Sequence, residues 1–216
     1  MLAGRAVGEN GRVSSLRPTG NRAVPGTRLR LFVLVAVLAV STDLITKSLI
    51  VAHIKSTSDG VRLLGGAVYL VQARNSGAAF SVGTGATVAL TIISLIVAVV
   101  IARAATRLAS TGWAVSLGLV LGGAIGNLVD RFFRAPSPGK GHVVDWISVF
   151  ANDGHVFPIF NVADSCIVVG GCLAVLLSLL GVDFRGSRGS AATKQATEQA
   201  GDEPEPEPVT EPPQNG

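Results

Sequence analysis

Four long apolar stretches constrain what this chain can fold into more than any other feature of its sequence. Each stretch is long enough for a helix to cross the hydrocarbon core of a bilayer, which is roughly 30 Å thick. Of the 216 residues, 48% are hydrophobic and only 15% are charged, so an ordinary globule of this composition would be insoluble. The sequence predicts an all-α membrane protein with four transmembrane helices, at Leu29–Ala52, Ala86–Ala102, Trp113–Phe133 and Phe160–Gly181.

The first stretch has a second interpretation, as a cleaved secretory signal peptide. Arginines precede its core "LFVLVAVLAV", and the small residues Ala39 and Ser41 lie at the end of that core. The apolar run resumes after "STDLITK" with "SLIVA", however, and this makes the segment longer than a typical cleaved signal. The pattern favours a membrane-spanning helix.

The two ends of the chain differ from this apolar body. Residues 1–28 are rich in Gly, Arg and Pro, and residues 182–216 finish in "GDEPEPEPVTEPPQNG", so both are predicted to be disordered tails. Many of the arginines lie in these tails and in the connection between the second and third spans, which predicts that both termini are cytoplasmic. The net charge of +4 needs no nucleic acid partner to explain it.

Two segments lie outside the membrane in this topology, on the extracytoplasmic side. Residues 53–85 contain the runs "VRLL" and "AVYLV" around Gly65 and Gly66, which predict a small β-hairpin or sheet at the membrane surface. The connection between the last two spans begins as a Pro/Gly loop and continues into an apolar stretch that holds Asp145 and Trp146. Aromatic residues favour the membrane interface, so this stretch is predicted to be an interfacial segment.

Polar side chains of the spans converge near the extracytoplasmic leaflet. Each is costly in hydrocarbon unless it faces protein or water. The set comprises Asp43, Lys47, Asn127, Asp130, Arg131, Asn161 and Asp164. Asp145 joins them because it lies in the connection between the last two spans. The sequence therefore predicts either a structural polar network or a reaction centre at this depth.

Two pairs in this set have a structural interpretation. Asp43 and Lys47 are spaced i,i+4 on one helix, where opposite charges can meet. Asp130 is adjacent to Arg131, and a neighbouring cation holds a carboxylate ionised. Both pairs are interpreted as structural ion pairs.

Asp164 and Asp145 are harder to explain in this way. Asn161 and Asp164 have the spacing of a helix capping box, but Asp145 has no close cationic neighbour in sequence. Two carboxylates in a low-dielectric site tend to share one proton, as in aspartic proteases. The ionised partner then takes a proton from the attacking water, and the protonated partner polarises the carbonyl. A helix N-terminus favours an ionised Asp164 as the initial base.

Other chemistries have less support. The chain has no GxSxG or GxGD motif, and no histidine lies near the serines and cysteines of this region in sequence. It also has no CxxC or HExxH motif and no histidine cluster, so no metal site is predicted. Cys166 and Cys172 lie about 120° apart around a helix and cannot pair with each other.

Two alternatives use the same carboxylates. A small proton-coupled transporter would use them as a relay, with acids spread through the membrane depth and inverted repeats. A lipid transferase that depends on a divalent metal would use them as oxygen ligands, and a chelator would then abolish its activity.

Five motifs together closely resemble the lipoprotein signal peptidases, also called signal peptidase II. The resemblance covers about residues 29–181, with the motifs in the family's order. The motifs are "STDLITK" (41–47), "RNSGAAFS" (74–81), "LGGAIGNLVDR" (121–131), "HVVDW" (142–146) and "PIFNVADSCIVVG" (158–170).

The resemblance implies a four-helix aspartyl protease of the bacterial cytoplasmic membrane. Such enzymes need no metal or other cofactor, and they cleave a prolipoprotein just before a cysteine that carries a diacylglyceryl thioether. The family's catalytic dyad falls on Asp145 and Asp164. Its supporting residues match Asp43, Lys47, Asn75, Asn127, Asp130, Arg131 and Asn161. The resemblance implies that the partners are membrane lipid and the prolipoprotein. It also implies that globomycin-like cyclic peptides inhibit the enzyme and that the protein is a monomer.

Among the supporting residues, Asn75, Asn127 and Arg131 are candidates for holding the substrate backbone or the oxyanion, because amides and guanidinium groups donate to developing negative charge. Two positions depart from the family's pattern. Leu44 stands where many members have glutamine, and Trp146 where phenylalanine is usual. The loop before Asp145 is also longer than usual.

Overall fold

The structure is a computed structural model that describes residues 25–56, 59–77 and 83–184. Its helices are α1 (Pro25–His53), α2 (Gly83–Ala105), α3 (Thr111–Phe133) and α4 (Val162–Leu179). All four are long and apolar enough to cross a membrane, which confirms the four predicted spans. α1 begins at Pro25, inside the segment predicted as the N-terminal tail, and proline is favoured in the first turn of a helix. Most of the two predicted tails lies outside the described residues.

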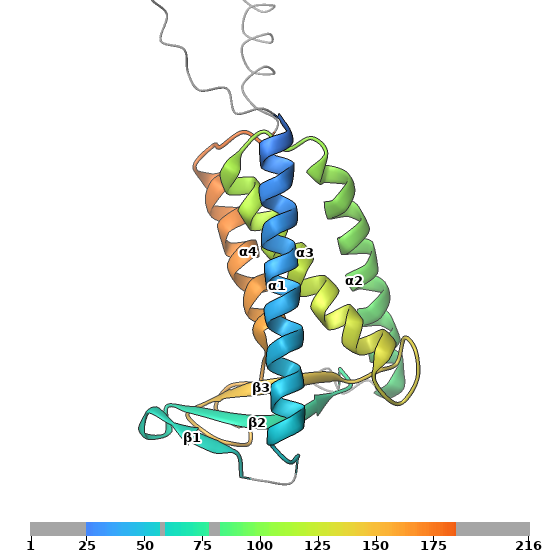
Figure 1. The fold of residues 1–216 in the computed structure, drawn as a ribbon, viewed down its shortest axis with the longest axis vertical. Coiled ribbons are helices and arrows are strands. Elements are labelled where there is room, and N and C mark those ends of the chain that lie inside the picture. The colour runs from blue at the N-terminus through green and yellow to red at the C-terminus, as the bar shows by residue number, and fades with distance from the viewer. Residues whose placement is uncertain (1–24, 57–58, 78–82, 185–216) are drawn as a thin grey trace, which may run out of the picture.

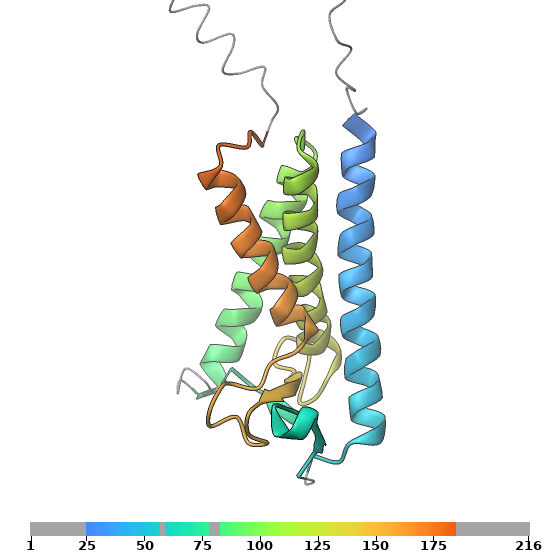
Figure 2. The ribbon, with the colours of Figure 1, turned by 90° about the vertical axis from the view of Figure 1, so that its left-hand side faces the viewer.

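The four helices run side by side, with a small sheet across one end of the bundle (Figures 1 and 2). The start of α1 and the end of α4 are both at the end of the bundle away from the sheet (Figures 1 and 2). More than half of α3 is buried, whereas no more than 22% of any other span is. α3 is therefore the core of the bundle, and the other helices turn large apolar side chains outward, as lipid-facing helices do.

Small residues let α3 approach its neighbours closely. A Cβ added at Gly122 would lie 2.5 Å from the Cβ of Ala39 on α1. One added at Gly126 would lie 2.5 Å from Oδ2 of Asp43, also on α1. Close backbone approach through small residues is typical of helix packing in membranes. It brings the polar residues of α1 and α3 within contact distance.

The sheet has three antiparallel strands in the order β1 (Val61–Leu63), β2 (Val68–Asn75) and β3 (Val143–Val149). A short 3₁₀ turn (Leu64–Gly66) joins the first two strands, so the predicted hairpin is confirmed. The third strand is a feature that sequence reasoning missed, because it assigned this stretch to an interfacial segment. This stretch pairs with β2, which lies far away in the sequence, so the third strand of the sheet forms through a non-local contact.

One junction brings the start of α4 against β3. The backbone N–H groups of Trp146 and Ile147 donate to the carbonyl of Phe160 at 3.0 and 2.8 Å, and the N–H of Phe160 donates back to Ile147 at 3.0 Å. The residue after Phe160 is Asn161, the N-cap of α4. The chain thus returns from the sheet directly into the first turn of the last helix.

Candidate active site

Asp145 lies on β3, opposite Ala73 of β2, and its side chain faces the helix ends. It is 2% exposed. The side-chain amide of Asn75, the last residue of β2, donates to Oδ2 of Asp145 at 2.8 Å. Oδ1 of Asn75 accepts in turn from the N–H of Gly77 at 2.7 Å, which fixes the orientation of that amide.

Asp164 lies in the first turn of α4, where it completes the predicted capping box. Its N–H donates to Oδ1 of Asn161 at 2.9 Å, and its Oδ2 accepts from the N–H of Asn161 at 3.2 Å. Its Oδ1 also accepts from Nδ2 of Asn127, on α3, at 2.8 Å. The cap and the polar network are therefore parts of one arrangement, not competing explanations of Asp164.

Asn161 links the two carboxylates, because its backbone N–H donates to Asp164 and its side-chain Nδ2 donates to Oδ1 of Asp145 at 2.7 Å. The same Nδ2 also donates to Oδ1 of Asn127 at 3.2 Å. Asn161 is fully buried. Within the described part of the chain, neither Asp145 nor Asp164 forms an ion pair, and amide groups supply the side-chain hydrogen bonds to both.

Burial raises the pKa of Asp145 to about 6, from an ordinary value of 3.8. The hydrogen bonds from Asn75 and Asn161 oppose this increase, and the negative charge of Asp164 adds to it. A carboxyl group with such a pKa holds or releases a proton near neutral pH, as acid–base catalysis requires.

A second group of charges surrounds Lys47, on the α1 side of the site. Nζ of Lys47 lies 2.7 Å from Oδ2 of Asp43 and 3.0 Å from Oδ2 of Asp130, and it donates to Oδ1 of Asn127 at 3.0 Å. Oδ1 of Asp43 accepts from the N–H of Ala163 at 2.9 Å. These contacts agree with the interpretation of Asp43 and Lys47 as a structural ion pair.

The partners of Asp130 differ from the expected one. Asp130 pairs with Lys47 and with Arg134, one helical turn further on, and accepts from the N–H of Val144 at 3.1 Å. No ion pair joins it to Arg131 in the described ranges. Adjacent residues point in different directions on a helix, whereas i,i+4 neighbours share a face. The i,i+4 spacing of Asp130 and Arg134 in the sequence would have identified Arg134 as the partner.

Arg131 interacts electrostatically with three carboxylates, Asp164, Asp145 and Asp130. Its Nη1 donates to the carbonyl of Asn127 at 3.3 Å. The side chain is nearly buried, and its Nε has no hydrogen-bond partner. Of the three residues considered for binding substrate, Arg131 has spare donors, whereas the amides of Asn75 and Asn127 already donate to the two carboxylates.

A cavity of about 420 Å³ opens next to Asp145. It lies between β2 and the segment that leads from β3 to α4. Its lining residues are Ala73, Arg74, Asn75, Ser76, Asp145, Asp153, Gly154, Pro158 and Ile159. The volume is within the range of small-molecule and peptide pockets, so a segment of a substrate chain fits beside the carboxylate.

These features define a class of protein: a four-helix membrane protein with two carboxylates, one buried and one half-buried, that are linked through Asn161 at one end of its bundle. Comparison with known families matches residues 35–180 to signal peptidase (SPase) II. The chain belongs to the signal peptidase II family, and it is accordingly a membrane protease of bacterial type.

Individual relatives agree with this assignment. A lipoprotein signal peptidase of Mycobacterium leprae is 47% identical over 161 residues, which are 74% of this chain and 77% of the relative. One of Rhodococcus jostii is 50% identical over 161 residues, or 74% and 78% of the two chains. A solved structure described as a bacterial membrane enzyme superposes with a TM-score of 0.60 at 29% identity, covering 73% of this chain and 95% of the other.

Proposed function

We propose that this protein is an intramembrane aspartyl endopeptidase with Asp145 and Asp164 as its catalytic dyad. Its substrates are prolipoproteins that carry a diacylglyceryl group, and it cleaves just before the modified cysteine. Family membership supports the substrate class. The observation that carries the mechanism is the hydrogen bond from Asn161 to Asp145, because Asn161 also caps the helix on which Asp164 lies.

In this mechanism the two carboxyl groups have different protonation states. Asp164, in the first turn of α4, takes a proton from water as the oxygen attacks the scissile carbonyl. Asp145, with a pKa of about 6, donates its proton to the carbonyl oxygen. Collapse of the tetrahedral intermediate breaks the C–N bond: the leaving amine receives the proton held by Asp164, and a hydroxyl of the intermediate returns a proton to Asp145 as the carbonyl re-forms.

Arg131 is the group best suited to bind the substrate near the dyad. Its Nη1 donates to the carbonyl of Asn127, and the remaining N–H groups of a guanidinium can donate to carbonyl oxygens or to developing negative charge. Asn75 and Asn127 hold the carboxylates in orientation through their side-chain amides. Asp43, Lys47 and Asp130 hold α1, α3 and β3 together behind the dyad.

The proposed orientation places the sheet and dyad at the extracytoplasmic leaflet of the bacterial cytoplasmic membrane. Arg28, Arg30, Arg103 and Arg107 belong to the opposite end of the bundle, where the termini of the described fold also lie (Figure 1), and seven more of the 18 Lys and Arg residues lie in the sequence beyond those termini. By the positive-inside rule that end is cytoplasmic. A substrate anchored by its own acyl chains then reaches the dyad laterally from the bilayer.

Cleavage of a diacylglyceryl-modified prolipoprotein in bilayers tests this proposal. Asp145→Asn and Asp164→Asn are each expected to abolish cleavage in folded protein, and a chelator is expected to have no effect on the parent. Asp153→Asn is the control, because Asp153 lines the same cavity but is well exposed. A globomycin-like peptide is expected to inhibit the parent.

Three results would contradict the proposal. Near-parent activity in either dyad variant would remove that aspartate from the chemistry. Loss of activity with chelator would favour a metal-dependent lipid transferase. A parent that binds the substrate but never cleaves it would favour the proton-coupled transporter.

A further inference from the structure

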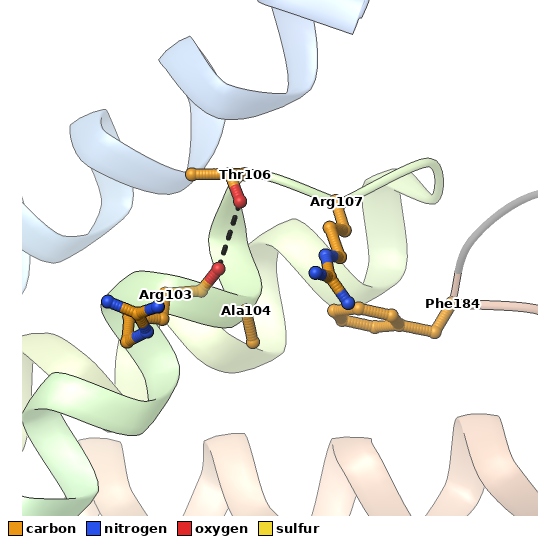
Figure 3. A pocket seen from close by; sticks show the side chains of 5 residues that line it. All are labelled: Arg103, Ala104, Thr106, Arg107 and Phe184. Carbon is orange, nitrogen blue, oxygen red and sulfur yellow. Dashed lines mark hydrogen bonds between the residues drawn. The ribbon is translucent and has the colours of Figure 1, made fainter.

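A second cavity lies at the opposite end of the bundle from the dyad. Its volume is about 470 Å³. The cavity is lined by Arg103, Ala104, Thr106, Arg107 and Phe184, which come from the end of α2, the turn after it and the segment after α4 (Figure 3). The proposed peptidase chemistry uses none of these residues.

The segment after α4, which forms one side of this cavity, is held in place by contacts with the loop between α2 and α3 and with α3. The carbonyl of Phe184 accepts from the N–H of Ala109 at 3.0 Å, and the ring of Phe184 packs edge-to-face on Trp113 with centroids 5.5 Å apart. Nε1 of Trp113 donates to the carbonyl of Val182 at 2.9 Å. The segment after α4 is therefore fixed against the loop between α2 and α3, and the cavity is a formed feature.

Two arginines supply positive charge to the cavity. Arg103 and Arg107 are spaced i,i+4, and both are exposed. Neither takes part in the ion pairs of Asp43, Asp130 and Asp153. The hydroxyl of Thr106 already donates to the carbonyl of Arg103 at 2.9 Å (Figure 3), so the guanidinium groups are the principal free donors here. Guanidinium groups match phosphate oxygens with paired hydrogen bonds.

The position of the cavity suits a lipid. The membrane-spanning part of α2 is Thr87–Ala105, so Arg103 and Arg107 lie where that span ends, at the depth of lipid headgroups. Ile96, Val99 and Val100, on the preceding turns of α2, are each more than half exposed. Acyl chains can lie along this apolar surface while the headgroup occupies the cavity.

We infer that this cavity binds the headgroup phosphate of an anionic phospholipid, with Arg103 and Arg107 as the ligands of the phosphate. Phe184 and Ala104 provide apolar contact for the glycerol part of the headgroup. The inference does not depend on the proposed dyad, because the two sites lie at opposite ends of the bundle.

Native mass spectrometry of the full-length protein released from mixed micelles tests this inference. The probes are phosphatidylglycerol, phosphatidylcholine and inorganic phosphate. The parent is expected to retain phosphatidylglycerol in preference to phosphatidylcholine. In the double variant Arg103→Gln/Arg107→Gln, that preference is expected to fall by at least about tenfold, since each juxtamembrane arginine contributes roughly fivefold. Arg30→Gln is the matched control, an exposed arginine of α1 that does not line the cavity, and it is expected to retain the preference.

Other outcomes would overturn the inference. Equal losses in the double variant and in Arg30→Gln would show general electrostatic attraction without a site. Retention of inorganic phosphate but not of the lipid would show a free-anion site. The acidic tail is the remaining competitor. If lipid retention appears only after Glu203, Glu205, Glu207 and Glu211 are changed to Gln, and depends on Arg103 and Arg107, the tail occupies the cavity.

Unchanged unfolding temperatures would show that the variants are folded. Unchanged prolipoprotein cleavage would show that they leave the dyad intact. A double variant that is folded, active and still selective for phosphatidylglycerol would contradict the inference directly.

Discussion

The side-chain amide of Asn161 lies 2.7 Å from Oδ1 of Asp145, across the boundary between the sheet and the helical bundle. The same side chain caps α4 through its oxygen, which accepts from the N–H of Asp164. One residue thus sets both where the last helix begins and where the two carboxylates stand relative to each other.

The two roles of Asn161 can be separated by substitution. Asn161→Ser keeps an oxygen that caps a helix but loses the contact with Asp145, so we expect a near-parent unfolding temperature and a cleavage rate reduced by at least about tenfold. Asn161→Ala loses both contacts and should also lower stability by about 1 kcal/mol. Thermal unfolding and prolipoprotein cleavage, measured on both variants, check this. A parent-like rate in Asn161→Ser would show that the bridge has no part in catalysis.

The pKa of Asp145 predicts the pH dependence of cleavage. If Asp145 acts as the acid, kcat/KM should fall as the pH rises through about 6, because its proton is lost there. The hydrogen bond from Asn75 lowers this pKa, so Asn75→Ala should move the decline to higher pH. Asn152→Ala, at an exposed position outside the cavity, is the control and should leave the profile unchanged. A downward shift in Asn75→Ala would contradict the assignment.

The same pKa predicts a change in stability with pH. A carboxyl group with a pKa of 3.8 when unfolded and about 6 when folded binds its proton more tightly in the folded state. The folded state therefore loses stability as the pH rises from about 4 to about 6, by at most about 3 kcal/mol. Thermal unfolding of the parent and of Asp145→Asn across this range measures the effect. The parent should lose stability relative to the variant as the pH rises, and a constant difference would refute the prediction.

Lys47 is fully buried between Asp43 and Asp130. Lys47→Met leaves the buried Asp43 without its cation and Asp130 with Arg134 alone. Removing one partner of a buried ion pair costs about 3–5 kcal/mol, so the variant should unfold at a much lower temperature. Lys140→Met, at an exposed position, is the control and should behave like the parent. If Lys47→Met unfolds like Lys140→Met, the ion pairs do not stabilise the bundle.

Gly126 of α3 tests the close approach of α3 to α1, and Gly171 of α4 serves as the control. A Cβ at Gly126 would lie 2.5 Å from Oδ2 of Asp43, so Gly126→Ala should destabilise the protein and reduce cleavage. A Cβ at Gly171 would meet nothing within 4 Å, so Gly171→Ala should be neutral or slightly stabilising, because alanine favours helix. Unfolding temperature and cleavage rate distinguish the two. Equal effects would mean that the contact at Gly126 relaxes without cost.

The helices were predictable because hydropathy is a local property of the sequence, and the hairpin was predictable from its two short β-type runs. β3 was not, since its partner β2 lies far away along the chain. The capping box and the pair of Asp43 and Lys47 follow from helical spacing. The contacts of Asn127 and Asn161 with the carboxylates depend on how helices and sheet pack, and no local pattern specifies those. The assignment of Asp145 and Asp164 to the chemistry stays a prediction.

The polar cluster combines residues from three helices and the sheet: Lys47 from α1, Asn127 from α3, Asp145 from β3 and Asp164 from α4. During synthesis, a nascent chain that has not yet inserted α4 lacks half of the proposed dyad. If the proposed dyad is catalytic, the capacity for hydrolysis arises only after α4 has been made and has packed against α3 and the sheet.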